Sequence, residues 1–443
     1  MKTALLRALR TVRNKDAWSF RQAVFQDLAS RKPAVRAAVG VHRALGASRA
    51  STLLVSAYGL SSYLGVRAPG GGAPVLAVNA YRNEERQLDW LAGLLGEGAI
   101  DRVQLDARAA LSREGLAALA DLLAHPGDVR RALRVIHRFN AEGNFLVSCR
   151  VASTLGYYLR LKPLLAAHPA RATLVSSDTN PYAMGLSYAA RDLGRPTIYV
   201  THGHIPDGPP PLDFDLSILD GPAVLRVYED MGPTRGAVVY KGAEGDCRPM
   251  DTSGLRAARR APRGGDLNVG VFLSLMLDWD TIGPLLRAVR ERLNPARLLV
   301  RLHPNRIIRP DDYRERLLAD ELGLEISTGD SVLLADAERC DVVLTGNSSC
   351  HLSLLKYGVP TVYNRQLDTV PHDFYRFIAE RMVLEVPELS ALDPSAVADF
   401  YDDPGWAARF AFFDASYGRA QSELDAAVTE AVRALAGIQA APA

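Results

Sequence analysis

The sequence predicts an α/β fold with two Rossmann-like domains, a helical N-terminal arm and C-terminal helices. Three observations lead to this fold class. From about residue 74, short apolar segments alternate with helix-like ones; a stretch rich in Arg, Gly and Pro interrupts them; the alternation then restarts. Near-continuous apolar strands that alternate with helices are typical of a parallel sheet covered on both faces. A length of 443 residues suits two or three domains.

The first alternating run is assigned to a domain over residues 71–247, preceded by the arm at 1–70. Its helices are expected at 84–98 and 181–194, with two or three more ending in 145–168. Its strands are expected at 74–81, 101–106, 172–178, 196–203, 214–221 and 236–242.

Residues 248–266 lack apolar periodicity and are interpreted as an interdomain linker. The second domain, 267–390, has expected strands at 268–275, 297–304, 324–328, 341–346 and 360–364, with helices between them. Residues 391–443 are expected to be helical and to return to the first domain. Two such domains predict a ligand site at their interface.

Composition excludes several classes of protein. The hydrophobic fraction of 48% and charged fraction of 23% are those of a globular chain, and no apolar run is long enough to span a membrane. The apolar stretch at the start is too short for a signal peptide. The four cysteines are scattered without CxxC spacing, which argues against disulfides and zinc. We expect a reducing, cytoplasmic location and no metal.

Positive charge is concentrated at the start of the chain. Residues 1–50 hold eleven Lys and Arg against two Asp, a net +9, which leaves −7 for the rest. Leu5, Leu9 and Val12 form a helical stripe among basic residues, a pattern that suits an anionic membrane surface. The alternative is a solvated helix that packs on its own domain. The acidic remainder argues against a nucleic-acid partner.

Ligands of open α/β sheets bind beyond the carboxyl ends of the strands, so the loops there are the candidate site. One such loop is Gly346-Asn347-Ser348-Ser349, between a strand and a helix. Backbone N–H groups and hydroxyls at that point favour a phosphate, although a plain N-cap has the same residues. The chain has no Walker lysine and no GxGxxG.

Arg301 and His303 end another predicted strand, before Pro304. Residues two apart share a face of a strand, so both side chains are expected on one side. Two such donors suit a pyrophosphate or a nucleoside monophosphate. The alternative for His303 is a hydrogen bond to local backbone.

The third loop is His202-Gly203-His204, with Asp207 just beyond. Zinc needs more ligands than this loop supplies. Gly203 is interpreted as permitting an abrupt turn that points His202 towards the ligand as a general base, with His204 on the acceptor side. The alternative is a loop histidine bonded to its own turn.

The fourth loop, "SSDTNP", follows the preceding strand and holds Asp178 and Asn180. Asp178 is a candidate to orient a histidine, bind a sugar hydroxyl, or act as base or nucleophile. Asn180 is a candidate substrate ligand. The alternative for Asp178 is a cap on the following helix.

Together these motifs resemble a known group. A strand ending in His-Gly, a later strand ending in His-Pro, and a Ser-Ser helix start followed by "LLKYGVPTV" resemble GT-B-fold glycosyltransferases of bacterial surface polysaccharides. The group includes the CDP-glycerol glycerophosphotransferases, the bacterial sialyltransferases and polysialyltransferases, and the Kdo transferases of capsule and O-antigen. The resemblance covers roughly residues 172–364.

The resemblance implies that His303, Ser348 and Ser349 hold the donor phosphate and that His202 acts near the transferred group. A sialyltransferase D/E-D/E-G motif is matched only by Glu229-Asp230-Met231-Gly232, which carries an extra residue. A retaining Kdo transferase would need a carboxylate nucleophile, for which Asp178 comes first and Asp207 second.

The sequence therefore predicts a metal-independent glycosyltransferase using a nucleotide-activated sugar, with a CMP-linked acidic sugar such as Kdo or sialic acid favoured. Its acceptor would be a surface polysaccharide (capsule or lipopolysaccharide) or a lipid-linked glycan, reached from the cytoplasmic face of the membrane. The alternatives are a CDP-glycerol or CDP-ribitol polyol-phosphate transferase, a sugar-nucleotide 2-epimerase, and a non-catalytic nucleotide-sugar-binding protein.

Overall fold

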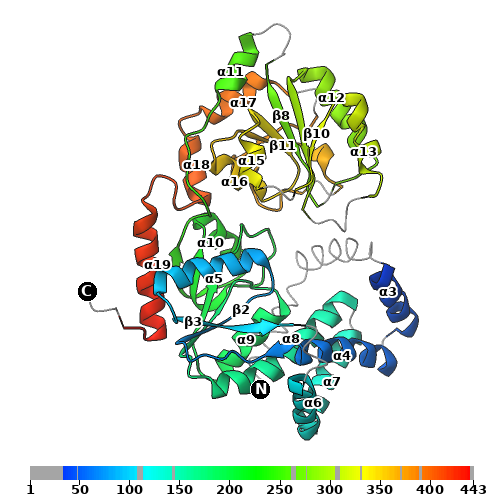
Figure 1. The fold of residues 1–443 in the computed structure, drawn as a ribbon, viewed down its shortest axis with the longest axis vertical. Helices are drawn as coiled ribbons and strands as arrows, with labels where there is room; N and C mark the ends of the chain where they lie inside the picture. The colour runs from blue at the N-terminus through cyan, green and yellow to red at the C-terminus, as the bar shows by residue number, and fades with distance from the viewer. Residues whose placement is uncertain are drawn as a thin grey trace.

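A computed structural model of the chain contains two domains, each built on a mostly parallel sheet (Figure 1). It describes residues 33–439, apart from 47, 107–112, 142–144, 261–265, 276, 305–309, 330–331, 370–371 and 389–391. The predicted fold class is confirmed: both domains are Rossmann-like, as in the GT-B arrangement, and helices precede and follow them.

The N-terminal sheet has the strand order β1-β3-β2-β4-β5-β6-β7, and only the β1–β3 pair is antiparallel. Every residue of β2, β4 and β5 is buried, because helices cover both faces. This burial explains why these strands read as continuous apolar runs. The strands are β1 (Val66–Arg67), β2 (Val75–Val78), β3 (Ile100–Leu105), β4 (Ala172–Val175), β5 (Thr197–Val200), β6 (Asp213–Leu219) and β7 (Arg235–Tyr240).

Two helices far apart in sequence cover one face of this sheet. Leu88 and Leu91 of α5 (Arg82–Leu95) share a core with Val428 and Val432 of α19 (Gln421–Ala436). The opposite face packs against α8 (Phe145–Ala167), α9 (Pro181–Asp192) and α10 (Pro222–Glu229). The last helix of the chain therefore completes the first domain, and it lies along that domain's side in Figure 1.

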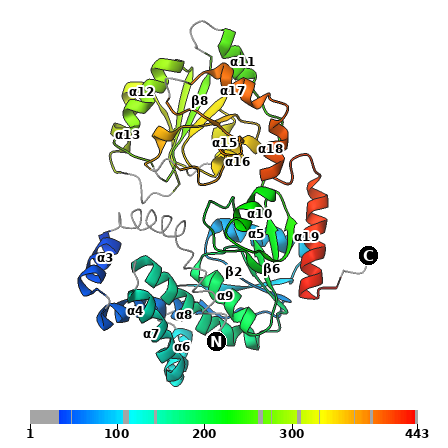
Figure 2. The same cartoon turned by 180° about the vertical axis from the view of Figure 1, so that it is seen from behind.

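A further layer of helices lies outside α8, as Figure 2 shows from behind. It consists of α3 (Pro33–Leu45), α4 (Arg49–Leu64), α6 (Arg113–Ala124) and α7 (Pro126–Ala141). At the crossing of α4 with α8 the backbones touch, since a Cβ on Gly59 would lie 2.5 Å from the Ala152 carbonyl oxygen. The predicted arm is thus corrected: α4 packs into the first domain. Residues 1–32 and their predicted stripe lie outside the described residues.

The C-terminal sheet has the order β10-β9-β8-β11-β12-β13, and within the described residues its strand pairs are parallel. Its core divides between α12 on one face and α15 on the other. The strands are β8 (Asn268–Phe272), β9 (Arg297–Arg301), β10 (Glu325–Ser327), β11 (Val342–Thr345), β12 (Thr361–Tyr363) and β13 (Leu384–Glu385). The helices are α12 (Ile282–Leu293), α13 (Tyr313–Arg316), α14 (Ala319–Leu322), α15 (Leu333–Ala337), α16 (Cys350–Lys356) and α17 (Pro394–Tyr401), with a 3₁₀ turn at Arg365–Leu367.

The chain passes between the domains twice. Part of the predicted linker is not extended: Ser253–Arg260 form helix α11, and Leu255 is buried in the C-terminal core beside α17. The return passes through α18 (Trp406–Phe413) into α19. The Lys356 ammonium contacts both connecting segments. It binds the Ala243 carbonyl at 2.6 Å in the first segment, and Asp414 at 2.8 Å and Ser416 at 2.7 Å in the returning one.

Within the described ranges, no helix combines the length and hydropathy needed to cross a membrane.

Candidate active site

The carboxyl ends of the two sheets meet at the domain interface. The Asp207 N–H, in the loop after β5, donates to the Phe374 carbonyl, in the segment after β12, at 2.6 Å. The Arg376 guanidinium then binds the carboxylates of Asp207 and Asp230. The loop that begins at His202 and the segment after β12 therefore meet at one interface, where the rule for open α/β sheets places a ligand.

His202 lies directly after β5, beside the end of β4. Its Nδ1 is hydrogen-bonded to the backbone carbonyl of Ser176. A carbonyl only accepts, so Nδ1 must carry the proton and Nε2 keeps its lone pair in the neutral ring. The imidazole is half buried and has the tautomer that a general base requires.

Gly203 does not act as the sequence suggested. Its φ is outside the left-handed region, and a Cβ placed there would meet no atom within 4 Å. The turn therefore does not require glycine's conformational freedom. What the glycine leaves is open space beside His202.

His204 is separated from His202 and does not line an open site. Only 6% of it is exposed, and its ring packs against Phe377 at 5.2 Å and Phe413 at 5.3 Å between centroids. Burial lowers its pKa to about 4. His204, which was expected on the acceptor side, is thus a neutral ring in the packing between the domains, and its role towards the acceptor stays a prediction.

Asp178 is buried and is held by a tyrosine. The Tyr228 hydroxyl donates to its carboxylate at 2.7 Å, and the Tyr199 hydroxyl lies 3.1 Å from that of Tyr228. Burial, with the nearby carboxylate second, raises the Tyr228 pKa well above its usual value, so this tyrosine remains a donor. His202 is thus oriented by a backbone carbonyl, while Asp178 belongs to a separate buried network.

Asn180 binds Glu84, a residue that sequence reasoning missed. The Asn180 side-chain amide donates to Glu84 at 3.0 Å, and the Tyr182 hydroxyl donates to the same carboxylate at 2.6 Å. Glu84 is 1% exposed and also accepts from the N–H of Ala80 at 3.0 Å. This network ties the turn after β2 to the turn after β4, the point where the strand order reverses. In the described structure Asn180 therefore shapes the edge of the site.

In the C-terminal domain, the Arg301 side chain is paired with a carboxylate of its own domain. Its guanidinium is buried and forms an ion pair with the buried carboxylate of Asp336 in α15. Ser327 also donates to Asp336, at 2.6 Å. The structure therefore places Arg301 in the core of its domain, paired with Asp336, and its role as a phosphate ligand stays a prediction. His303 lies beyond the end of β9 and is half exposed.

The loop from Gly346 to Ser349 is shaped by Asp368, which sequence reasoning also missed. A Cβ on Gly346 would lie 2.3 Å from the Asp368 carboxylate, so any larger residue would displace that carboxylate. Asp368 accepts from the Asn347 N–H and from the Ser274 hydroxyl at 2.7 Å. Burial raises its pKa to about 6. It joins the ends of β8, β11 and β12.

The polar side chains of the same loop differ in their surroundings. The Asn347 amide donates to the His372 carbonyl, which directs it to the domain interface. The Ser348 hydroxyl accepts from the Cys350 N–H at 3.3 Å, while Ser349 is exposed and forms no side-chain cap. The serines thus remain at the protein surface at the carboxyl edge of the sheet.

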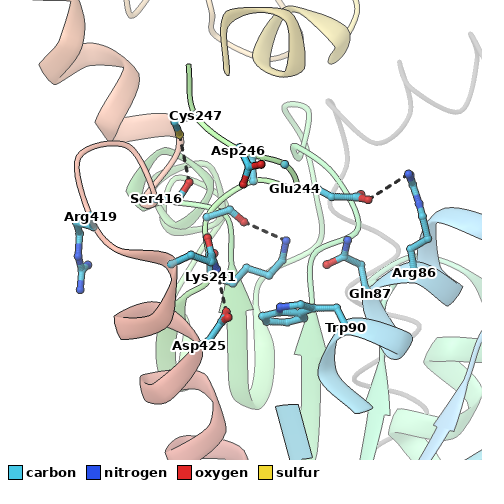
Figure 3. Close-up of a pocket in the computed structure, with 14 residues that line it drawn as sticks. Arg86, Gln87, Trp90, Lys241, Glu244, Asp246, Cys247, Ser416, Arg419 and Asp425 are labelled. Carbon is cyan, nitrogen blue, oxygen red and sulfur yellow. Dashed lines mark hydrogen bonds and ion pairs between the residues drawn. The ribbon is translucent and has the colours of Figure 1, made fainter. Parts of the chain in front are cut away.

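A cavity of about 600 Å³ opens beside this interface, at the carboxyl end of β7 (Figure 3). Its walls come from α5, from residues 241–247 and from the start of α19. Lys241 lies on its floor, 5.9 Å from the centre of the Trp90 ring, and binds Asp220 at 2.6 Å. Asp220 also accepts from the Thr201 hydroxyl at 2.9 Å, so the floor is joined to the residue before His202. No sequence motif marks this cavity, because its walls are far apart in the chain.

Among the residues that the structure describes, no three His, Cys, Asp or Glu side chains lie together as a metal site requires.

Comparisons with known proteins find distantly similar solved structures but no similar sequence. No protein-family model matches the sequence. No curated protein sequence matches it. Solved structures similar over most of the chain include an S. aureus MnaA–UDP complex (13% identity, 84% of this chain and 99% of that one, TM-score 0.47).

A second is a putative UDP-N-acetylglucosamine 2-epimerase from Listeria monocytogenes, with 12% identity over 81% of this chain and 95% of that one and a TM-score of 0.45. A third is the glycotransferase of kitacinnamycin, with 13% identity over 83% of this chain and 100% of that one and a TM-score of 0.45. At these identities and TM-scores the likeness is one of architecture, and the functional argument rests on the site itself.

Proposed function

We propose that this protein is a glycosyltransferase that uses a nucleotide-activated sugar. The observation that carries the proposal is the His202 tautomer: a ring nitrogen with a lone pair, held by the Ser176 carbonyl, at the edge where the two sheets meet. An acceptor hydroxyl attacks the anomeric carbon, and His202 Nε2 takes its proton. The bond from that carbon to the donor's phosphate oxygen breaks, and the nucleotide leaves.

On the donor side, we propose Ser348, Ser349, Asn347 and His303 as the groups that meet the phosphate. They follow β11 and β9 of the C-terminal sheet, on the edge that faces the first domain. Hydroxyl, amide and imidazole donors compensate charge on a departing phosphate without a metal ion. Gly346, pressed against Asp368, determines where this loop lies.

Asp178 has a narrower proposed role. As a buried carboxylate that receives the Tyr228 hydroxyl, it is proposed to fix the turn after β4, with a sugar hydroxyl as its second partner. Asp207 is bound by Arg376 and is proposed to hold the domains together.

For the particular donor and acceptor, the resemblance of the His-Gly, His-Pro and Ser-Ser motifs supports a CMP-linked acidic sugar and a surface glycan or its lipid-linked precursor. The cytoplasmic location expected from the cysteine pattern stays a prediction.

The test has two stages. Isothermal titration with CMP, CDP and UDP should give measurable affinity for at least one nucleotide, and Ser348→Ala should weaken it. Binding of none of the three would overturn the proposal. The corresponding sugar nucleotide is then incubated with and without a glycan acceptor, and the products are identified by mass spectrometry and NMR.

Release of nucleotide with a new glycan product is the expected result. A sugar epimer formed without acceptor would instead identify an epimerase. Transfer of a polyol phosphate from CDP-glycerol would identify a polyol-phosphate transferase.

A further inference from the structure

The helical layer formed by α3, α4, α6 and α7 has an unusual surface. Nine large hydrophobic side chains are exposed by more than a third in the described residues, and seven of them belong to this layer. Single exposed apolar residues need no explanation, but a concentration of them on one layer marks an interaction site. The seven are Val41, Leu45, Leu53, Leu54, Tyr58, Leu116 and Leu123.

A pocket of about 280 Å³ lies within the same layer, between α4, α6, α7 and α8. Its walls are almost wholly aliphatic, and include Leu53, Ala57, Leu122, Ile136 and Leu155. The hydroxyl of Ser56, also in the wall, donates to the Thr52 carbonyl at 2.7 Å. The walls therefore offer a ligand apolar contact and almost no hydrogen bonding, which suits a hydrocarbon.

The exposed surface of the same helical layer is positively charged. Helix α7 exposes Arg130, Arg131, Arg134 and Arg138 on its outer side, and Asp128, its one acidic residue, forms an ion pair with Arg131. Helices α3 and α4 carry three arginines and no acidic residue. Arginine pairs with phosphate-bearing headgroups, and several near a surface add to the attraction of an anionic bilayer.

We propose that this pocket binds a hydrocarbon chain of an anionic lipid, and that α3, α4, α6 and α7 dock the protein on a membrane surface containing that lipid. The apolar pocket and the arginines supply the two signals that stable peripheral attachment requires. The proposal does not depend on the transferase reaction, since lipid binding requires no nucleotide.

A second copy of the chain is a less suitable occupant. Two copies meeting through this layer would bring the arginines of both α7 helices together, and like charges oppose such contact. An anionic headgroup region instead compensates them. Residues 1–32 are also basic, so their contribution must be separated by experiment.

The membrane part is tested by cosedimentation of the full chain with vesicles of phosphatidylcholine, with and without phosphatidylglycerol. Wild type should bind the anionic vesicles roughly tenfold more strongly or better. Leu53→Asp and the double variant Arg130→Glu/Arg134→Glu should each lose most of this preference. Matched controls are Val332→Asp and Arg292→Glu, exposed positions in the C-terminal domain that should bind as wild type does.

The pocket is tested with cis-parinaric acid, whose fluorescence rises in an apolar site. Ala57→Trp, which fills the pocket, should weaken its binding roughly tenfold. Ala426→Trp, on the exposed face of α19, should not. Circular dichroism and thermal melting check that each variant folds.

Three results would overturn the proposal. The first is that the Leu53→Asp and arginine variants fold and bind anionic vesicles as wild type does, and the second is that removal of residues 1–32 alone abolishes vesicle binding. The third is that wild type forms a dimer that Leu53→Asp loses, while neither protein binds vesicles. Because no assay contains a nucleotide, failure here is distinct from failure of the transferase.

Discussion

The two sheet edges that form the candidate site differ in how their predicted ligand-binding residues are held. At the N-terminal edge, His202 makes one hydrogen bond to a carbonyl and keeps a basic nitrogen. At the C-terminal edge, Arg301 is buried against Asp336 and unavailable to a phosphate in this structure. A permanent charge at a buried strand end needs a counter-charge, whereas a neutral imidazole needs only one partner. Charge alone is therefore a poor guide to a ligand at such an edge.

The largest effect is expected from His202→Ala, which tests whether His202 is the general base. If Nε2 takes the acceptor's proton, kcat should fall by about 10² to 10⁴-fold, while nucleotide affinity is unchanged. Steady-state kinetics with titration calorimetry measures both. His204→Phe is the control, since His204 packs between aromatic rings; a loss of turnover as large as in His202→Ala would reverse the roles assigned to the two histidines.

Arg301→Ala tests the other edge. Removing one partner of a buried ion pair should lower the free energy of unfolding by about 3–5 kcal/mol, because Asp336 would be left buried without its counter-charge. Chemical denaturation measures the loss. Arg301→Met combined with Asp336→Leu should recover much of it. A stable Arg301→Ala that no longer binds nucleotide would restore Arg301 as a phosphate ligand.

The pH dependence of stability tests the buried position of His204. Burial lowers the pKa of His204 from 6.5 to about 4, so between these values the unfolded chain binds more protons and stability falls as pH falls. The His204 contribution to this loss is about 3 kcal/mol by pH 4.

His204→Phe should make unfolding less acid-sensitive, as measured by denaturation at a series of pH values. His351, with a pKa lowered to about 3 by burial, acts in the same direction and remains in the variant. An unchanged pH profile would contradict the buried position of His204.

The smallest expected effect is that of Asp207→Asn. Its ion pair with Arg376 is partly exposed, and Arg376 keeps Asp230 as a second partner. Stability should change by less than about 1 kcal/mol and turnover by less than about tenfold. Abolished turnover in a folded variant would instead make Asp207 catalytic.

Much of the fold was predictable because strand burial leaves a local signature. Continuous apolar runs such as those of β2, β4 and β5 occur where both faces of a sheet are covered. The edge where a ligand is expected follows from strand direction, and the loops of His202, Asp178 and Ser348 do follow strands β5, β4 and β11; their part in ligand binding stays a prediction. The misassigned segments have no such signature: α11 in the predicted linker is short and arginine-rich, and α4 was counted with a basic arm although it packs on α8.

The site was predictable only in part, because hydrogen-bond partners are not local. Glu84 lies 96 residues from Asn180, and Asp368 is 94 residues from Ser274. Neither carboxylate carries a motif. The cavity floored by Lys241 and the aliphatic pocket among α4, α6, α7 and α8 likewise have walls from distant segments.

By itself, the sequence determined the class of fold, the edge at which the site lies and the loops that form it, since these follow from periodicity and chain direction. Only the tertiary structure decided which side chains remain available. In that structure Arg301 forms an ion pair with Asp336, Asn180 donates to Glu84 and His204 packs among aromatic rings, while His202 keeps a basic nitrogen. For Arg301 and Asn180 the physical reason is that a buried charge or amide needs a polar partner, and packing in three dimensions decides which partner that is.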